Sequence, residues 1–439
     1  MNTIISPQLS HIETYLYRDN RPSHPLDFFV QLELEGDFCP ERFQAAIGRT
    51  LPFHPLLQAR VSEAGRQLKW CLRDSAAEIS FQEQADSGTV AAINIQQNAG
   101  LKCWFSRSQP GTVVTFQFHH AATDGLGAFG FIEDVLRCYS SDETCLEKWE
   151  PRSVSRLKER HWCGYEKDSI LSMVRRQAKA LYASREFSGR EFVPVKQHQL
   201  ATGDDAPADS YPHFLSHQFS QEETQAMDAL ARRLSVSRNT LLLRNAFVAV
   251  DQFRQNLDEY SANDWMRIAV PGNVRFGKTN DNIPAANLFS MTFPAFSGLQ
   301  ISDHTALLQQ IQQNMTASRR DYYLPTFLLA LKAMTKIPGA MERTVKANKC
   351  MATFLLTNVG CPLQDFSSAT CRDSTQHLLV VANVQLIPPM RPFQTISLAV
   401  MEHNQRQNVT ISYDARVHSQ DEVQQMMNNL VQQFLLATD

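Results

Sequence analysis

The organisation of the chain follows from one stretch, Phe116-Gln117-Phe118-His119-His120-Ala121-Ala122-Thr123-Asp124-Gly125. Residues 113–118, which begin just before this stretch, are rich in β-branched and aromatic side chains and are predicted to form a strand. Side chains alternate along a strand, so one face is apolar and ends in His120, while the other is polar and ends in His119. After Gly125 the apolar residues recur at helical spacing, which predicts a helix to about residue 139. An imidazole that ends a buried strand face beside a helix start is well placed to act as a proton-transferring base.

The composition describes a globular protein without a strong charge bias. The chain has 439 residues, which is enough for about two or three domain-sized units. Apolar residues make up 43% of the chain and charged residues 20%, as in ordinary globular proteins. The formal net charge of −3 argues against a polyanionic partner, so we expect no nucleic-acid binding.

Cysteine usage and the apolar pattern predict a cytoplasmic protein. The nine cysteines are scattered, without a C-x-x-C pair or metal-ligand spacing, so we expect reduced thiols and no bound metal. The first residues, Met1-Asn2-Thr3-Ile4-Ile5, lack the basic part and the long apolar part of a signal peptide. No apolar run approaches the ~20 residues needed to span a bilayer, so no transmembrane segment is expected.

Two mixed halves separated by a linker are predicted. Residues 191–211 show no periodicity and contain Gly203-Asp204-Asp205-Ala206-Pro207, which is typical of a linker. We therefore divide the chain into an N-terminal half at 1–190, the linker, and a C-terminal half at 212–439. Each half mixes helices and strands, which predicts an α/β fold of the mixed-sheet α+β sandwich type. A basic helix at 170–185 is either a solvated helix face or a docking surface for an acidic carrier or a nucleotide phosphate.

Local patterns place the remaining elements. Helices are expected at 9–18, 40–51, 220–234, 240–253 and 303–318, with a last one from 419. Strands are expected at 28–34, 57–61, 214–219, 266–270, 288–293, 354–356, 378–386, 395–401 and 408–413. Two of the helices open with capping boxes, which are Ser220 with Glu223 and Ser419 with Glu422.

The pattern His-His-x-x-x-Asp-Gly is complete at 119–125. It resembles the signature of the superfamily that includes chloramphenicol acetyltransferase, peptide-synthetase condensation domains, polyketide-associated acyltransferases and bacterial wax ester synthases. Further stretches are similar to the family and occur in its order along nearly the whole chain. They are Phe53-His54-Pro55-Leu56-Leu57-Gln58-Ala59-Arg60-Val61, Val270-Pro271-Gly272-Asn273-Val274-Arg275 with Asn287-Leu288-Phe289-Ser290, and Ile411-Ser412-Tyr413-Asp414. The chain lacks the Asp-Phe-Gly-Trp-Gly of the plant members.

This resemblance implies two chloramphenicol-acetyltransferase-like halves that meet in a V, with a tunnel between them. A thioester donor, either acyl-CoA or acyl-phosphopantetheine on an acyl carrier protein, would enter one end, and an acceptor hydroxyl or amine the other. The second histidine of the motif, His120, would be the catalytic base in mid-tunnel. Asp124 would complete the catalytic motif, mainly by pairing with an arginine of the second half that matches Arg275. With both halves in one chain, we expect a monomer without a permanently bound cofactor.

Acyl transfer from a thioester needs a base, because the attacking alcohol or amine is protonated at neutral pH. A histidine, with a pKa near 6.5, can remove this proton and return it to the departing thiolate. A thiol is a good leaving group, so no nucleophilic serine is required, and the chain contains no G-x-S-x-G elbow. The tetrahedral intermediate needs hydrogen-bond donors. Candidates are the Gly125 backbone at the helix start and the Thr357 hydroxyl or Asn358 amide after a buried strand.

Each candidate residue also has a purely structural interpretation. His119 points to the opposite face and is expected to hydrogen-bond the backbone. Asp124 can cap the following helix, which is compatible with an ion pair to Arg275. Gly125 can serve only to allow an unusual backbone angle, and Asn358 can belong to a simple turn. A metal bound by the two adjacent histidines is not expected, because adjacent strand residues point apart.

Three functions fit these residues. The first is a stand-alone acyltransferase that forms an ester or amide on a small molecule from acyl-CoA. The second uses the same chemistry with a carrier-bound donor, as in a free-standing condensation enzyme. The third is a catalytically silent domain that keeps the fold and recruits a carrier protein. The intact motif and the lack of a carrier-like segment in this sequence favour the first.

Overall fold

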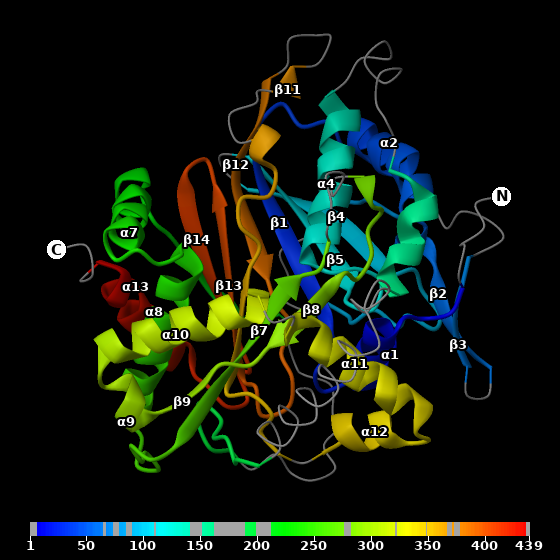
Figure 1. Ribbon diagram of the computed structural model, residues 1–439. Helices are drawn as coiled ribbons and strands as arrows, with labels where there is room; N and C mark the ends of the chain where they lie inside the picture. The colour runs from blue at the N-terminus through cyan, green and yellow to red at the C-terminus, as the bar shows by residue number, and fades with distance from the viewer. Residues whose placement is uncertain are drawn as a thin grey trace.

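Two large β-sheets, each with helices packed on it, form the two lobes of the protein (Figure 1). The computed structural model describes residues 7–64, 67–72, 79–84, 90–108, 111–140, 152–161, 189–198, 212–275, 282–320, 323–347, 349–366, 371–372 and 378–435. The predicted basic helix at 170–185 therefore lies outside the described residues.

The first lobe is built on an antiparallel sheet with the strand order β11-β12-β1-β5-β4. Its strands are β1 (Asp27–Gly36), β4 (Leu101–Arg107), β5 (Thr112–His119), β11 (Cys371–Arg372) and β12 (Leu378–Ile387). Helices α2 (Pro40–Thr50) and α4 (Gly125–Ser140) pack against each other. Phe43 of α2 and Phe131 of α4 both contact Phe116 on the apolar face of β5. The strand that ends in the His-His motif is thus buried beneath two helices.

Smaller elements complete this lobe. They are α1 (His11–Asp19), α3 (Pro55–Gln58) and the hairpin of β2 (Arg60–Ala64) and β3 (Gln67–Cys71). A strand was expected at 57–61, but its first residues form α3 instead. Pro55 explains this difference, because proline fixes φ at a value suited to the first position of a helix.

The second lobe is built on a mixed sheet in the order β6-β14-β13-β10-β7-β8, with β9 paired to β7. Its strands are β6 (Phe214–Gln218), β7 (Trp265–Asn273), β8 (Phe289–Thr292), β9 (Ala295–Ser297), β10 (Phe354–Asn358), β13 (Ile396–His403) and β14 (Arg406–Tyr413). Strand β10 runs parallel to both of its neighbours, β7 and β13. The helices are α7 (Gln221–Arg233), α8 (Arg238–Arg254), α9 (Gly298–Ile301), α10 (His304–Arg320) and α13 (Gln420–Leu435).

Two helices from late in the chain pack on the first lobe. Helices α11 (Tyr323–Lys336) and α12 (Ala340–Val345) both contact α1, and they lie beside it in Figure 1. Leu331 of α11 and Met341 of α12 belong to the same hydrophobic core as the strands of the first sheet. This core therefore draws on residues from both ends of the chain.

Strand β12 connects the two lobes, because it comes from the second half of the sequence and pairs in the first sheet. In the sequence, β12 comes after most strands of the second sheet. It nevertheless pairs with β1 of the first sheet along most of its own length. Of the predicted linker, residues 191–198 pack on the second lobe, where Val195 is fully buried, and 199–211 lie outside the described residues. The division of the chain at this linker therefore stays a prediction. The sheets do not follow it, because β12 comes from the predicted C-terminal half and pairs in the first sheet.

Truncating Ile387 to alanine tests how firmly β12 is held in the first sheet. Ile387 lies opposite Phe29 of β1, is fully buried and packs with Phe29 and Met390. Ile387→Ala should lower the free energy of unfolding in urea by about 2–5 kcal/mol, because it leaves a cavity. Leu299→Ala, at a side chain that is 61% exposed, should change it by less than about 0.5 kcal/mol. Equal effects of the two changes would contradict this placement of β12.

Candidate active site

His120 follows directly after β5 and lies where the two lobes meet. Its ring lies against Phe28 of β1 and Phe289 of β8, with ring centroids 5.2 and 5.5 Å away. Its backbone N–H donates to the carbonyl of Leu26 at 2.8 Å, and its own carbonyl accepts from the Asn287 amide at 2.8 Å. Aromatic rings from both lobes therefore contact the imidazole, and hydrogen bonds from both lobes hold its backbone.

The environment keeps the His120 ring neutral at neutral pH. Burial lowers its pKa, and the backbone of His120 itself and the charge of Asp124 offset this only in part. The Nδ1 atom is shielded from solvent, while the ring lines a cavity, so Nε2 is the nitrogen that faces that cavity. A neutral imidazole with one accessible nitrogen can accept a proton from a molecule in the cavity.

His119 lies on the opposite face of the strand and is fully buried. Its Nδ1 accepts a hydrogen bond from the backbone N–H of Ala121 at 3.1 Å, as expected from the sequence. Burial lowers the pKa of His119 to about 3, so this ring is neutral as well. Its contact with the backbone of the turn gives it a structural position, and it does not line the cavity.

The Asp124 carboxylate joins the turn after β5 to the second lobe. Both of its oxygens accept hydrogen bonds from the Arg275 guanidinium. Nη2 lies 2.8 Å from Oδ1, and Nη1 lies 2.9 Å from Oδ2. The N–H of Gly127 donates to Oδ1 at 2.8 Å, which caps α4, and the N–H of Leu288 donates to Oδ2 at 2.8 Å. The two side chains are only 7% and 8% exposed. The helix cap and the pair between the lobes, both suggested by the sequence, are thus present together.

The segment 282–288 carries further contacts between the lobes. The Asn287 side chain donates to the carbonyls of both His120 and Ala121, each at 2.8 Å. The carbonyl of Ala286 accepts from Arg275 at 3.0 Å. This segment of the second lobe therefore holds the backbone that directly follows the candidate base. The sequence indicated the similarity of 287–290 to the family, but it did not indicate this role for Asn287.

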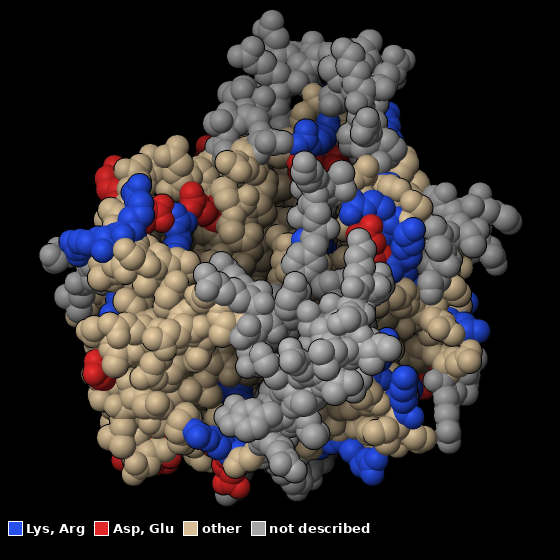
Figure 2. Space-filling view, viewed as in Figure 1, with Lys and Arg blue, Asp and Glu red and all other residues tan. Residues whose placement is uncertain are grey.

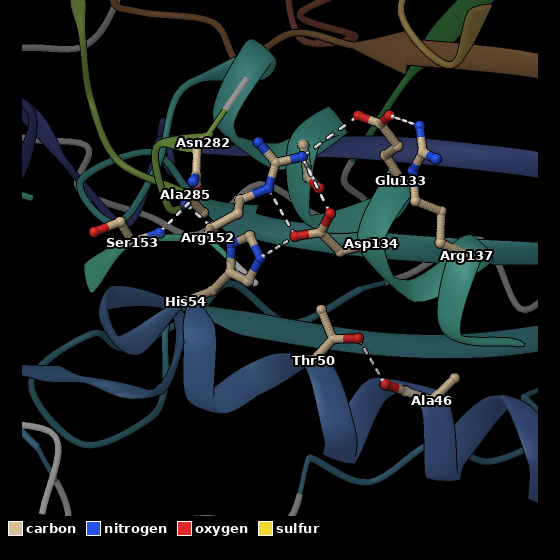
Figure 3. Close-up of polar contacts among 11 residues, drawn as sticks. Ala46, Thr50, His54, Glu133, Asp134, Arg137, Arg152, Ser153, Asn282 and Ala285 are labelled. Atoms are coloured by element: carbon tan, nitrogen blue, oxygen red, sulfur yellow. Dashed lines mark hydrogen bonds and ion pairs between the residues drawn. The ribbon is translucent and has the colours of Figure 1, made fainter. Parts of the chain in front are cut away.

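A buried network around His54 holds the other end of the same segment (Figure 3). The N–H of Ala285 donates to His54 Nδ1 at 3.0 Å, and His54 Nε2 lies 2.9 Å from the Asp134 carboxylate of α4. Arg152 completes the network with Nε 2.7 Å from that carboxylate. Because Nδ1 accepts a hydrogen bond, the His54 proton is on Nε2 and the ring is neutral, which agrees with a pKa lowered by burial. His54 is therefore a structural link between the lobes.

Gly125 and Thr357 lie at the cavity, and Asn358 does not. Gly125 is the first residue of α4 and does not have a positive φ, so the interpretation as an unusual backbone angle is wrong. A Cβ there would lie 3.3 Å from Val359 Cγ1, so space is restricted. Thr357, on β10, lines the cavity. Asn358 instead accepts from the N–H of Gly360 at 2.9 Å, in the simple turn that the sequence left open as an alternative.

The cavity lies between the two lobes and has a volume of ≈ 1760 Å³. This exceeds the roughly 300–1,000 Å³ of a site for one drug-sized ligand, so there is room for two substrates at once. Its walls come from α1, β1, β7, β8, β10 and α11 and are rich in apolar side chains. Helix α11 was not expected from the sequence, although its apolar residues recur at helical spacing.

Two findings limit the kinds of site on the described residues. Within these residues, no three His, Cys, Asp or Glu side chains gather in a way that could hold a metal ion. None of the helices that the structure describes combines the length and apolar character needed to cross a membrane. On the face seen in Figure 2, Lys and Arg lie among Asp and Glu and form no single basic field on the coloured surface.

The change Asp124→Asn tests the charge of the pair between the lobes. Asparagine can still cap α4, but the buried Arg275 loses its counter-charge, so the free energy of unfolding should fall by roughly 3–5 kcal/mol. Asp303→Asn is the matched control, because Asp303 caps α10 in an exposed position, with Ala306 N 3.0 Å from its Oδ1. That change should alter stability by less than about 0.5 kcal/mol. Urea unfolding measures both, and an unaltered midpoint in Asp124→Asn would refute the structural role.

Comparison with known proteins adds to this geometry. No family model and no curated protein sequence matches the chain. Solved structures do match over nearly the whole chain. Trichothecene 15-O-acetyltransferase from Fusarium sporotrichioides has a TM-score of 0.72 at 14% identity, over 98% of this chain and 94% of that one. The starter condensation domain of rhizomide synthetase, in complex with C8-CoA, has a TM-score of 0.65 at 14% identity, over 99% and 95%.

A third structure shows that the fold serves more than one reaction. The epimerization domain from the third module of tyrocidine synthetase B has a TM-score of 0.66 at 12% identity, over 100% of this chain and 98% of that one. At such identities the likeness shows the fold, which confirms the predicted mixed α/β fold with two lobes. The chain therefore shares its fold with this acetyltransferase, this condensation domain and this epimerization domain.

Proposed function

We propose that the protein transfers an acyl group from a thioester to a hydroxyl or amine of a small molecule, with His120 as general base. The observation that carries this proposal is the setting of His120. It is a partly buried, neutral imidazole that presents Nε2 to a large cavity walled by both lobes. A base in such a place can contact two substrates that enter the cavity, and the walls of the cavity exclude water from around them.

The reaction needs one proton transfer in each direction. Nε2 takes the proton of the acceptor hydroxyl or amine as that atom bonds to the thioester carbonyl carbon. The carbon–sulfur bond then breaks, and the same proton goes to the departing thiolate. No covalent bond to the protein forms at any stage. Asp124 does not touch the substrates in this scheme; it is a positioning residue that fixes the turn after His120 through Arg275.

The negative charge on the carbonyl oxygen needs donors nearby. The backbone N–H of Gly125 is in the first turn of α4, where N–H groups have no partner within the helix. Gly125 and the Thr357 hydroxyl both line the cavity that His120 faces. We assign these two groups to the oxyanion, and removal of one such donor typically lowers kcat by about 10²–10³-fold.

Two kinds of thioester donor fit the proposed reaction, which are acyl-CoA and a carrier-bound acyl group. The rhizomide condensation domain was solved with C8-CoA, which supports a CoA-type donor for a protein of this fold. A carrier-bound acyl group presents the same phosphopantetheine arm, so a free-standing condensation enzyme is the second candidate. Turnover of acyl-carrier protein but not of acyl-CoA would select it, whereas carrier binding without turnover would indicate a recruitment domain. We propose that the protein works as a monomer, because one chain supplies both lobes. We propose a cytoplasmic location from the scattered cysteines, which have no metal-ligand spacing.

Replacing the candidate base tests the proposal. His120→Ala should lower thiol release from acyl-CoA with a suitable acceptor by about 10²–10⁴-fold, and the protein should stay folded. His217→Ala serves as the control, because His217 is a partly exposed histidine of β6 that does not line the cavity. Release is followed with a thiol reagent and folding by circular dichroism. Undiminished turnover in folded His120→Ala would exclude His120 as the base.

The pH dependence of turnover tests the state of the same ring. Burial lowers the pKa of His120, so the base is already deprotonated at neutral pH. We expect kcat/KM to rise with pH through an apparent pKa below 6.5 and to be level around pH 7. The profile is measured with two different acyl-CoA donors, so that a limb common to both belongs to the protein. An acidic limb centred above pH 7 would disagree with the buried setting.

A further inference from the structure

One face of strand β7 forms a continuous wall of the cavity. Every second residue of this strand lines it, namely Trp265, Arg267, Ala269 and Pro271. Strand β8 continues the wall through Phe289, which pairs with Asn273 and lies against the His120 ring. Arg267 is six residues from Asn273, so it lies about 20 Å along the wall from the level of the candidate base. A long substrate can therefore reach both.

Two arginines at the far end of this wall lie over aromatic rings. The Arg267 guanidinium carbon is 3.5 Å from the centre of the Phe192 ring, and that of Arg190 is 3.8 Å from the centre of the Trp265 ring. All four side chains line the cavity. A guanidinium that stacks on a ring keeps its N–H edge for hydrogen bonds in the plane, which suits carboxylate and phosphate groups. The rings therefore hold both guanidinium groups at the cavity wall.

The charges that line the cavity are strongly unbalanced. Among the described residues of its lining, seven are Lys or Arg and one, Asp19, is acidic. Asp19 already pairs with Arg391, whose Nε lies 2.5 Å away. The positive residues include Lys332, Lys336 and Lys349, whereas the chain as a whole has a net charge of −3. The positive field is therefore a property of the cavity, and apolar acyl chains alone would gain nothing from it.

Arg267 is a cation that is largely removed from water. Its side chain is in a residue only 4% exposed, and burial lowers its pKa to about 10, so it remains a cation at neutral pH with little hydration. One of its donors reaches the carbonyl of Met351 at 3.2 Å. A buried cation is destabilising unless charged or polar groups compensate it. A substrate anion that arrives beside Arg267 would bind strongly, because the cation has already lost most of its water.

We propose that Arg190 and Arg267 form an anion-binding wall, which holds a phosphate or carboxylate group of a substrate whose reactive end lies at His120. This inference rests on the proposed acyl-transfer function. The anion has two possible sources with the same chemistry. It is either a phosphate of the thioester donor or a carboxylate at the far end of the acceptor. Both give a bidentate, charge-assisted contact to a guanidinium, which is worth about tenfold or more in affinity.

Binding measurements separate the sources. The protein is used with His120→Ala, so that substrates bind without turnover. Calorimetric titration compares CoA with pantetheine, which has the same arm without the nucleotide phosphates. It then compares ω-hydroxy fatty acids of graded length with their methyl esters. The variants Arg190→Gln and Arg267→Gln are tested beside Arg60→Gln, an exposed arginine outside the cavity lining. Arg190 is exposed, so its variant should fold even if that of Arg267 does not.

The effect of the arginine variants on these two binding preferences shows whether Arg190 and Arg267 bind an anion. A preference for CoA over pantetheine that falls about tenfold in Arg190→Gln or Arg267→Gln, but not in Arg60→Gln, supports the wall with the donor phosphate as its ligand. The same fall in the preference for acid over methyl ester supports it with the acceptor carboxylate. If both preferences are unchanged in Arg190→Gln, and in Arg267→Gln where that variant folds, the wall is not an anion site. Because turnover is not measured, failure of the proposed acyl transfer appears separately in the wild-type assay.

Discussion

The structure around the candidate base depends on one buried carboxylate. Asp124 accepts four hydrogen bonds, two from Arg275, one from the start of its own helix and one from the backbone of Leu288. Three of these donors belong to the second lobe, while Asp124 itself follows a strand of the first. A buried carboxylate needs donors to offset the loss of water, and here most of them come from the second lobe, so the conformation of the turn that contains His120 depends on contact between the lobes. The contact between the lobes and the position of the candidate base therefore depend on the same hydrogen bonds. The same segment that supplies Leu288 also places the Asn287 amide on the His120 carbonyl and the Ala285 N–H on His54.

Local sequence was sufficient for features that nearby residues determine. The alternation of β5 places Phe116 and Phe118 on a buried face that ends in His120, and the helix after Gly125 starts where the spacing of apolar residues changes. The capping box of Ser220 with Glu223 opens α7 as expected, because both hydrogen bonds join residues three apart. The family resemblance supplied the fold and the Asp124–Arg275 pair, whose members are 151 residues apart. Neither could have come from the spacing of residues alone.

What the sequence did not indicate depends on contacts between distant segments. The strand at 378–386 was expected, but nothing in its apolar pattern shows that it joins β1 in the other lobe. His54 belongs to a recognisable stretch, yet its partners Asp134 and Ala285 lie 80 and 231 residues away. Asn358 was a plausible donor by position, and only the backbone of the turn to Gly360 shows that its side chain is used there. The charge of the cavity was hidden by a net charge near zero, because the cations of β7, α11 and residue 190 are spread along the sequence. The average composition of a chain says little about the sign of one internal surface.

In the proposed reaction, the two lobes bring a thioester and a nucleophile to His120 Nε2 inside one cavity. The most direct test is a crystal structure of the protein with an acyl-CoA analogue in which a methylene group replaces the thioester sulfur. We expect the carbonyl of the analogue beside His120, with its oxygen about 2.7–3.1 Å from the Gly125 N–H and room for an acceptor atom within about 2.6–3.2 Å of Nε2. An analogue that binds in order elsewhere on the protein, and leaves the space at His120 without its carbonyl, would contradict the account.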